Sequence, residues 1–300
     1  MGTEGTMIAK TVELRLAKLV VCGRRLRDAG RYGEAEPILK KALTLAGEAF
    51  GPESIEVAGV LNHLGMLGKY RGSFDESEAA YRRALKIIAG SEHALAADLY
   101  HNLGGLEHAR GNFANGEAFA RRSVAIRTRL LGVEHPDTAR DLSALAALLD
   151  CQGRYKESEA LYVLAISILG KSDPDGLEVA VLLNNMAALC IATDRVNKAE
   201  RLYKRSLAIK KRTLGPHHPA LALTLNNLAV FYRSQGRLKE AARLYRRAIA
   251  IFETTLNPAH PKLTACRENY DQLQRQPPLT AVKMASSSPA SRICFLPTYS

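Results

Sequence analysis

The chain has 300 residues, 47% of them hydrophobic, with no tryptophan and a formal net charge of +12. This composition supplies enough apolar side chains for a packed core and excludes an intrinsically disordered polypeptide. No apolar run approaches the roughly 20 residues that a helix needs to cross a bilayer, so we expect a soluble protein without a transmembrane segment.

The five cysteines show neither disulfide pairing nor metal-ligand spacing. They are odd in number and scattered, at Cys22, Cys151, Cys190, Cys266 and Cys294. We interpret them as reduced, mostly buried thiols of a cytoplasmic protein. At the N-terminus, Gly2 followed by Thr6 formally fits a myristoylation signal, and the sequence leaves lipidation of Gly2 open.

Six segments repeat one pattern along the chain. Each has a turn residue at an equivalent position, and successive turn residues are separated by 42, 39, 42, 41 and 42 residues: Gly30, Gly72, Gly111, Gly153, Asp194 and Gly236. Such a regular period is typical of a repeat architecture, in which each unit packs only on its neighbours.

Each repeat is expected to form two helices around its turn residue. In the sixth repeat, apolar residues recur at spacings of three and four before the turn (Leu225, Leu228, Ala229, Tyr232) and after it (Ala241, Leu244, Tyr245, Ala248, Ile251). Glycine suits the turn because it adopts positive φ without a Cβ clash. His-Pro pairs such as His218-Pro219 mark the next turn, because proline disfavours helix in the residue before it, and we interpret them as turn chemistry rather than metal ligation.

These elements predict an all-α fold: a right-handed superhelical solenoid of about six helix-turn-helix repeats over residues 12–274. Residues 262–274 are polar on one side and are expected to form a C-terminal capping helix. Residues 1–11 form an N-terminal extension, and residues 275–300, which carry proline and serine without a helical period, are predicted to be disordered.

Two segments carry a resemblance to a known family. LNNLAVFYRSQGRLKEAARLYRRAIAIFETTLNPAHP (225–261) and LNNMAALCIATDRVNKAERLYKRSLAIKKRTLGPHHP (183–219) closely resemble the 42-residue repeats of kinesin light chain and its relatives in the tetratricopeptide superfamily. The resemblance covers roughly residues 11–274. It implies that an asparagine in the concave groove bonds the backbone of an extended peptide, and this role would carry over to Asn102, Asn185 and Asn227.

Asparagines recur at two neighbouring positions of the first helices, where the third repeat also has His101: Asn62, Asn102, Asn184, Asn185, Asn226 and Asn227. Asparagine is a poor helix former whose amide both donates and accepts hydrogen bonds, so its recurrence needs a reason. Two interpretations stay open: the amides clamp a peptide, or they brace neighbouring helices. The fourth repeat carries Ser143 and Ala144 instead, which places any transferred ligand specificity in doubt.

Other positions expected to face the groove are mostly basic. They hold Arg24, Arg27, Lys69, His108 and Arg233, against Asp150 as the one acid. A positive groove favours acidic side chains or a terminal carboxylate in the bound peptide.

A second basic set recurs on the second helices, as Lys40-Lys41, Arg82-Arg83, Arg121-Arg122, Lys204-Arg205 and Arg246-Arg247. Such a stripe can bind nucleic acid, but no aromatic residues interleave with it and glutamates lie one turn away, so we expect a solvated face and no nucleic-acid partner. The fourth repeat has Val163 and Leu164 at these positions, and this apolar spot leaves self-association or a partner contact open.

The sequence contains no Gly-rich phosphate loop, no Gly-x-Ser-x-Gly and no metal-binding cluster, so we expect neither an enzyme nor a metal or other cofactor. The first hypothesis for function is a scaffold that binds an extended or amphipathic peptide of a partner protein, with an acidic peptide favoured. The alternative is a regulatory module that senses a peptide or small ligand and controls an effector or transcription factor.

Overall fold

The computed structural model describes residues 2–89, 93–256, 258 and 260–275. Within these residues the structure has thirteen helices and no strand, which confirms the all-α prediction. The chain divides into two compact units, residues 1–152 and 153–300. Apart from Arg275, the tail predicted to be disordered lies outside the described residues.

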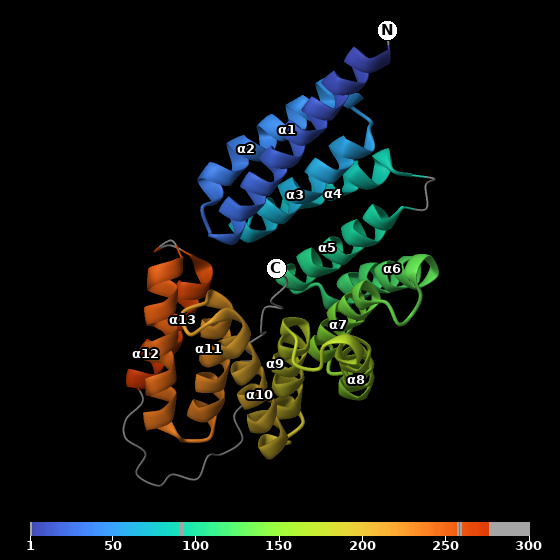
Figure 1. Ribbon diagram of the computed structural model, residues 1–300. Helices are drawn as coiled ribbons and strands as arrows, with labels where there is room; N and C mark the ends of the chain where they lie inside the picture. Colours follow the sequence, from blue (N-terminus) through green and yellow to red (C-terminus); the bar gives the residue numbers. More distant parts are fainter. Residues whose placement is uncertain (1, 90–92, 257, 259, 276–300) are drawn as a thin grey trace. The chain divides into compact units, whose positions relative to one another are not determined.

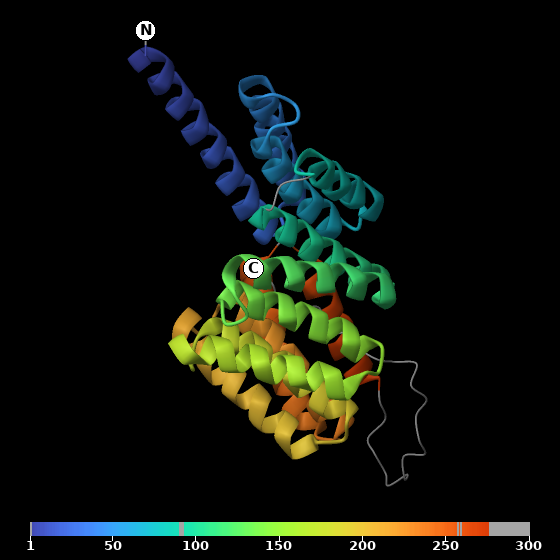
Figure 2. The same ribbon diagram turned by 90° about the vertical axis from the view of Figure 1, so that its right-hand side faces the viewer.

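The first unit contains seven helices, coloured blue to green in Figure 1: α1 (Gly2–Asp28), α2 (Tyr32–Phe50), α3 (Ile55–Arg71), α4 (Phe74–Ile87), α5 (Ala94–Arg110), α6 (Phe113–Leu131) and α7 (Pro136–Cys151). Consecutive helices pack as hairpins, and the first helices of neighbouring repeats, α1, α3, α5 and α7, also contact one another. Helix α1 begins at Gly2, so it includes residues that the sequence placed in an N-terminal extension. Its first turns project beyond α2 in Figure 2.

The second unit contains six helices: α8 (Tyr155–Ser172), α9 (Leu177–Ala192), α10 (Val196–Leu214), α11 (Pro219–Ser234), α12 (Leu238–Thr255) and α13 (Pro261–Gln274). Helix α13 packs on both α11 and α12, as expected for the predicted capping helix.

The turns lie where the repeat pattern places them. Each of the six predicted turn residues falls between two helices. Asp194 has φ 56° and is the one non-glycine residue with positive φ in the described part of the chain. Between repeats, the Nδ1 atoms of His135, His218 and His260 each accept the backbone N–H two residues ahead at 3.1 Å. These histidines are therefore helix N-caps.

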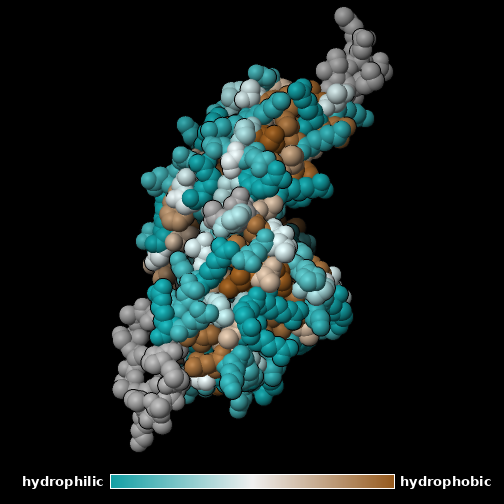
Figure 3. Space-filling view, turned by 90° about the vertical axis from the view of Figure 1, so that its left-hand side faces the viewer, coloured by the Kyte–Doolittle hydropathy of each residue, from teal (hydrophilic) through white to brown (hydrophobic). Residues whose placement is uncertain are grey.

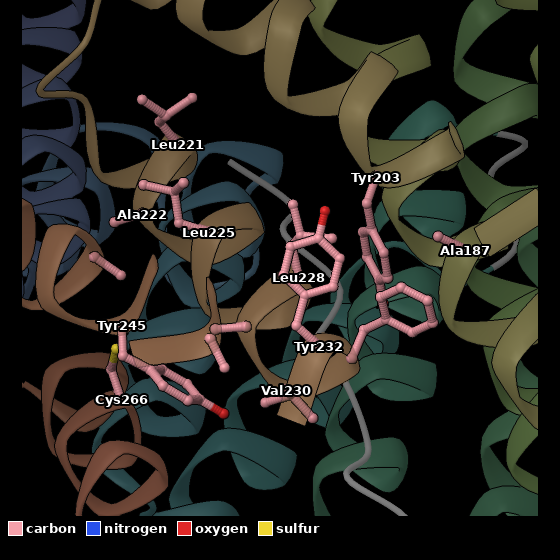
Figure 4. Close-up of a cluster of buried hydrophobic side chains, with 14 of the residues drawn as sticks. Ala187, Tyr203, Leu221, Ala222, Leu225, Leu228, Val230, Tyr232, Tyr245 and Cys266 are labelled. Atoms are coloured by element: carbon pink, nitrogen blue, oxygen red, sulfur yellow. The ribbon is translucent and has the colours of Figure 1, made fainter. Parts of the chain in front are cut away.

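Tyrosines at equivalent positions of the second helices fill the core. Tyr81, Tyr162, Tyr203 and Tyr245 are at most 2% exposed, and Figure 4 shows Tyr203 and Tyr245 among the apolar residues of the second unit. The first helix of the same repeat packs closely against this tyrosine ring. At Gly65 in α3, an added Cβ would lie 2.4 Å from the ring of Tyr81.

Hydrophilic residues cover most of the face shown in Figure 3. In four of the five basic pairs of the second helices, the first residue forms an ion pair with the glutamate four residues earlier, at 2.7–2.9 Å: Lys40 with Glu36, Arg82 with Glu78, Arg121 with Glu117 and Lys204 with Glu200. Val163 and Leu164 are 50% and 40% exposed. No helix among the described residues is sufficiently long and apolar to cross a membrane.

The outward face of α1 differs from the matching face of α3. Arg15, Lys18 and Arg25 of α1 are exposed, whereas the residues 42 positions later, Val57, Val60 and Leu67, are buried. Helix α3 packs against α2, the helix that precedes it in the chain. Helix α1 has polar residues at the positions that correspond to the buried residues of α3.

Candidate peptide-binding faces of the two units

In the first unit, the asparagines join two neighbouring first helices. Nδ2 of Asn102 on α5 donates a hydrogen bond of 2.8 Å to Oδ1 of Asn62 on α3, and both residues are 8% exposed. A buried amide that lost its partner would carry an uncompensated desolvation cost, so this bond braces α3 against α5.

His101, the neighbour of Asn102 on α5, belongs to a buried ionic network. Its Nδ1 lies 2.7 Å from Oδ1 of Asp141 on α7, and Nε of Arg127 donates to the other carboxylate oxygen at 3.1 Å. Arg127 also donates to Asp98 at 2.6 Å. Burial opposes ionisation of Asp141, but the hydrogen bond and charge of His101, together with Arg127, hold its pKa below the ordinary value. The repeat pattern does not predict this network, because Arg127 and Asp141 lie outside the positions expected to face the groove.

Three of the five basic residues predicted for the groove, Arg24, Arg27 and Lys69, lie on α1 and α3. Arg27 is 3% exposed and is paired with Asp28 at 2.7 Å, whereas Arg24 is exposed. Among the described residues neither Arg24 nor Lys69 forms an ion pair. Burial, and secondarily the charge of Arg27, lowers the pKa of Lys69 to about 8.

His63 lies beside these cations. Burial, followed by the charges of Arg27 and Arg24, lowers its pKa to about 4. Its Nδ1 is buried and has no hydrogen-bond partner among the described residues. This region therefore holds an excess of positive charge and an unfilled hydrogen-bonding position.

His108 is placed differently from the other basic residues. It is 8% exposed, its Nε2 lies 3.4 Å from Sγ of Cys151, and its ring meets that of Phe113 edge-on at 5.6 Å. The sequence analysis grouped His108 with the groove cations and did not predict its contact with Cys151.

In the second unit, the asparagines form one directional chain of amides. Asn269 donates to Asn226 at 3.2 Å and Asn226 to Asn227 at 3.4 Å. Asn227 in turn donates to Asn184 at 3.2 Å, and Asn184 donates to Asn185 at 3.3 Å. These bonds join α13, α11 and α9. Asn269 lies on the capping helix α13, beyond the six repeats, so the repeat pattern did not predict its part in this chain of amides.

The amide chain ends at Asn185. Its Oδ1 accepts from Asn184, but its Nδ2 is buried without a hydrogen-bond partner in the described part of the chain. Arg233, the basic residue predicted for this unit, donates to the backbone O of Asn269 at 3.2 Å and to Gln272 at 3.1 Å. Arg233 thus ties α11 to the capping helix.

The described residues contain no group of three or more histidine, cysteine or acidic side chains placed to hold a metal ion. The two units differ in the groups on these faces. The first unit has a cationic region between α1 and α3, and the second has the amide donor of Asn185, which has no partner among the described residues.

A tetratricopeptide repeat family model matches residues 23–89, 95–171 and 178–254, whereas no curated protein matches by sequence. Among solved structures, BtubC (BKLC) from P. vanneervenii is 21% identical over 91% of this chain and 99% of its own, with a TM-score of 0.56. The putative kinesin light chain repeats of Podosopora anserina are 23% identical over 68% of this chain and the whole of theirs, with a TM-score of 0.52. RapI is 14% identical over 87% of this chain and 98% of its own, with a TM-score of 0.58.

These similarities confirm the resemblance to kinesin light chain-like repeats and the repeat fold. Repeats of this kind in general mediate contacts between proteins and are typically non-enzymatic. With repeat matches across most of its length, the chain belongs to the tetratricopeptide repeat family.

Proposed function

We propose that this protein is a non-enzymatic, cytoplasmic scaffold that binds an extended or amphipathic acidic peptide of a partner protein. The observation that carries the proposal is the excess positive charge between α1 and α3. Arg24 and Lys69 have no ion-pair partner among the described residues, and burial, followed by the neighbouring charge of Arg27, lowers the pKa of Lys69. A peptide carboxylate would supply the missing charge, and charge-assisted hydrogen bonds are the stronger kind.

The second unit supports binding of the peptide backbone. Asn185 Nδ2 is a buried donor without a partner in the described residues, and a peptide carbonyl oxygen would satisfy it. Asn102 and Asn227 donate to neighbouring helices instead. Of the three asparagines transferred from the resembled family, Asn185 is therefore the one for which we favour a direct peptide contact.

Selection from a random peptide library would test both contacts. We expect the wild type to capture peptides enriched in aspartate and glutamate, and Lys69→Met to bind them about tenfold more weakly through loss of one charge-assisted contact. Lys41→Met, which removes an equal charge from an exposed position of α2, is the matched control and should bind like the wild type. Equal capture by all three proteins, or no acidic enrichment, would contradict the proposal.

Asn185→Ala tests the backbone contact separately. We expect weaker binding of every selected peptide whatever its charge, because a backbone bond does not depend on side-chain chemistry. Melting curves must first show that the variant is folded. Unchanged affinity in a folded variant would mean that Asn185 has no role in binding.

A regulatory module is the second candidate. The similarity in fold to RapI and to aspartyl phosphate phosphatase F from Bacillus subtilis favours it, although that second protein is 12% identical and shares only the fold. In this case the chain would bind an effector or transcription factor and release it when a peptide or small ligand is added. Pull-down with and without the selected peptides distinguishes the two functions.

A further inference from the structure

One pair of side chains has a chemistry that peptide binding does not use. Cys151 is the last residue of α7 and His108 lies in the last turn of α5. Sγ of the cysteine is 3.4 Å from Nε2 of the histidine, within hydrogen-bonding distance for sulfur. A thiol in contact with an imidazole has a base beside it, and the thiolate is the nucleophilic form of cysteine.

The other cysteines of the described residues lack this arrangement. Cys190 and Cys266 are buried, and burial raises the pKa of both thiols, that of Cys266 to about 12. Cys22 is exposed on α1. Cys151 is partly exposed, so it combines access from solvent with a neighbouring base. Cys294 lies outside the described residues.

The position of Cys151 at a helix C-terminus disfavours a permanent thiolate. Cys151 and His108 both lie at the C-terminal, negative ends of their helices, where the helix dipole disfavours an anion. The imidazole must therefore be the activating group, by taking the thiol proton as an electrophile is attacked. His108 is 8% exposed and has the ring of Phe113 beside it at 5.6 Å, so the surroundings favour a small, weakly polar electrophile.

We infer that Cys151 and His108 form a covalent modification site for small α,β-unsaturated carbonyl compounds. His108 removes the thiol proton while the sulfur of Cys151 attacks the β-carbon, which forms an S–C bond. The π-electron pair of the C=C bond moves to the α-carbon and carbonyl as an enolate. The imidazolium then returns its proton to the α-carbon. No group leaves, and neither an oxidant nor a reductant is required.

The surroundings of Cys151 support reversible oxidation of its thiol less well than alkylation. Reversible thiol oxidation generally uses a second cysteine to resolve the sulfenic acid. No two of the four described cysteines are joined in a disulfide.

The test uses N-ethylmaleimide at low concentration on the intact protein, with peptide mass spectrometry to measure the rate at each cysteine from pH 5 to 10. We expect Cys151 to react about tenfold faster than Cys22 at pH 7, although it is less exposed, and its rate to rise at lower pH than that of Cys22. Cys190 and Cys266 should remain unmodified in the folded protein.

His108→Gln removes the base and should slow Cys151 about tenfold while leaving Cys22 unchanged. The matched control is His135→Asn at the other end of α7, where asparagine retains the capping preference and the rate at Cys151 should be unaffected. The inference is overturned if Cys151 reacts no faster than Cys22 or if folded His108→Gln reacts like the wild type. Should His108→Gln fail to fold, the wild-type pH profile decides alone, since a profile coinciding with that of Cys22 excludes activation.

Discussion

Asparagines at the same position of different repeats differ in their hydrogen bonding in this protein. The side chains of Asn102 and Asn227 tie adjacent helices together, whereas Nδ2 of Asn185 at the same position has no partner in the described residues. The repeat period predicts where these amides lie. It does not predict their partners, because an amide can donate to a helix or to a ligand and the choice depends on side-chain rotation.

Tyr245 gives a prediction for a single residue. Its hydroxyl is buried without a hydrogen-bond partner in the described part of the chain, and burial raises its pKa to about 12. Tyr245→Phe removes an unsatisfied polar atom and retains the ring, so we expect the free energy of unfolding to stay equal or to rise by about 1 kcal/mol. Urea denaturation checks this, and a loss of more than about 1 kcal/mol would show that the hydroxyl has a partner.

At the level of the helix, two glycines of α3 are in opposite environments. An added Cβ at Gly65 would lie 2.4 Å from the ring of Tyr81, whereas at Gly59 it would meet nothing within 4 Å. We expect Gly65→Ala to lower the free energy of unfolding by about 1–3 kcal/mol through overpacking. Gly59→Ala should raise it by up to about 1 kcal/mol, because alanine favours a helix interior.

Thermal melting of the two glycine variants checks this prediction directly. Similar shifts for both would show that α3 and α4 are not held as closely as the structure indicates. The turn glycines could be predicted because they recur with the period. The role of Gly65 could not, because it depends on the ring that faces it from the next helix.

The same distinction applies to the contacts between repeats. The period indicates that His108 and Cys151 lie on first helices of successive repeats. It does not establish that Sγ and Nε2 come within 3.4 Å, because that depends on how the helices are rotated against each other. The sequence therefore predicted the fold and the turns, but it left the chemistry between the helices undetermined.

A buried lysine affects the free energy of unfolding of the whole molecule. Lys210 on α10 is 1% exposed and donates to Thr224 at 2.8 Å, with no ion pair to any described residue. Burial, followed by the charge of Lys262, lowers its pKa to about 8. At the equivalent position of the third repeat, Arg127 is paired with Asp98 and Asp141.

This difference predicts a pH dependence. Between pH 8 and pH 10.5 the unfolded chain keeps the proton on Lys210 while the folded chain has lost it, so the contribution of Lys210 to stability rises with pH across that window. Below pH 8 the buried charge is a cost of roughly 3 kcal/mol. Lys210→Met should therefore stabilise the protein at pH 7 and remove the part of this rise that comes from Lys210.

Urea denaturation at pH 7 and pH 10 measures both effects. Arg127→Met is the matched control, and it should destabilise the protein by about 3–5 kcal/mol because Asp141 would be left buried without its cation. If both variants lose stability at pH 7, Lys210 is compensated by a group outside the described residues.

The charged outer face of α1 has a consequence for assembly. The end of a repeat array can associate with a second copy if its outer face is apolar. A copy that stacked on α1 would have to bury Arg15, Lys18 and Arg25, which are exposed in this chain. Removing a charge from water costs several kcal/mol unless a partner is supplied. The charged face of α1 therefore makes end-to-end stacking of copies through this surface unfavourable unless the second copy supplies acidic partners.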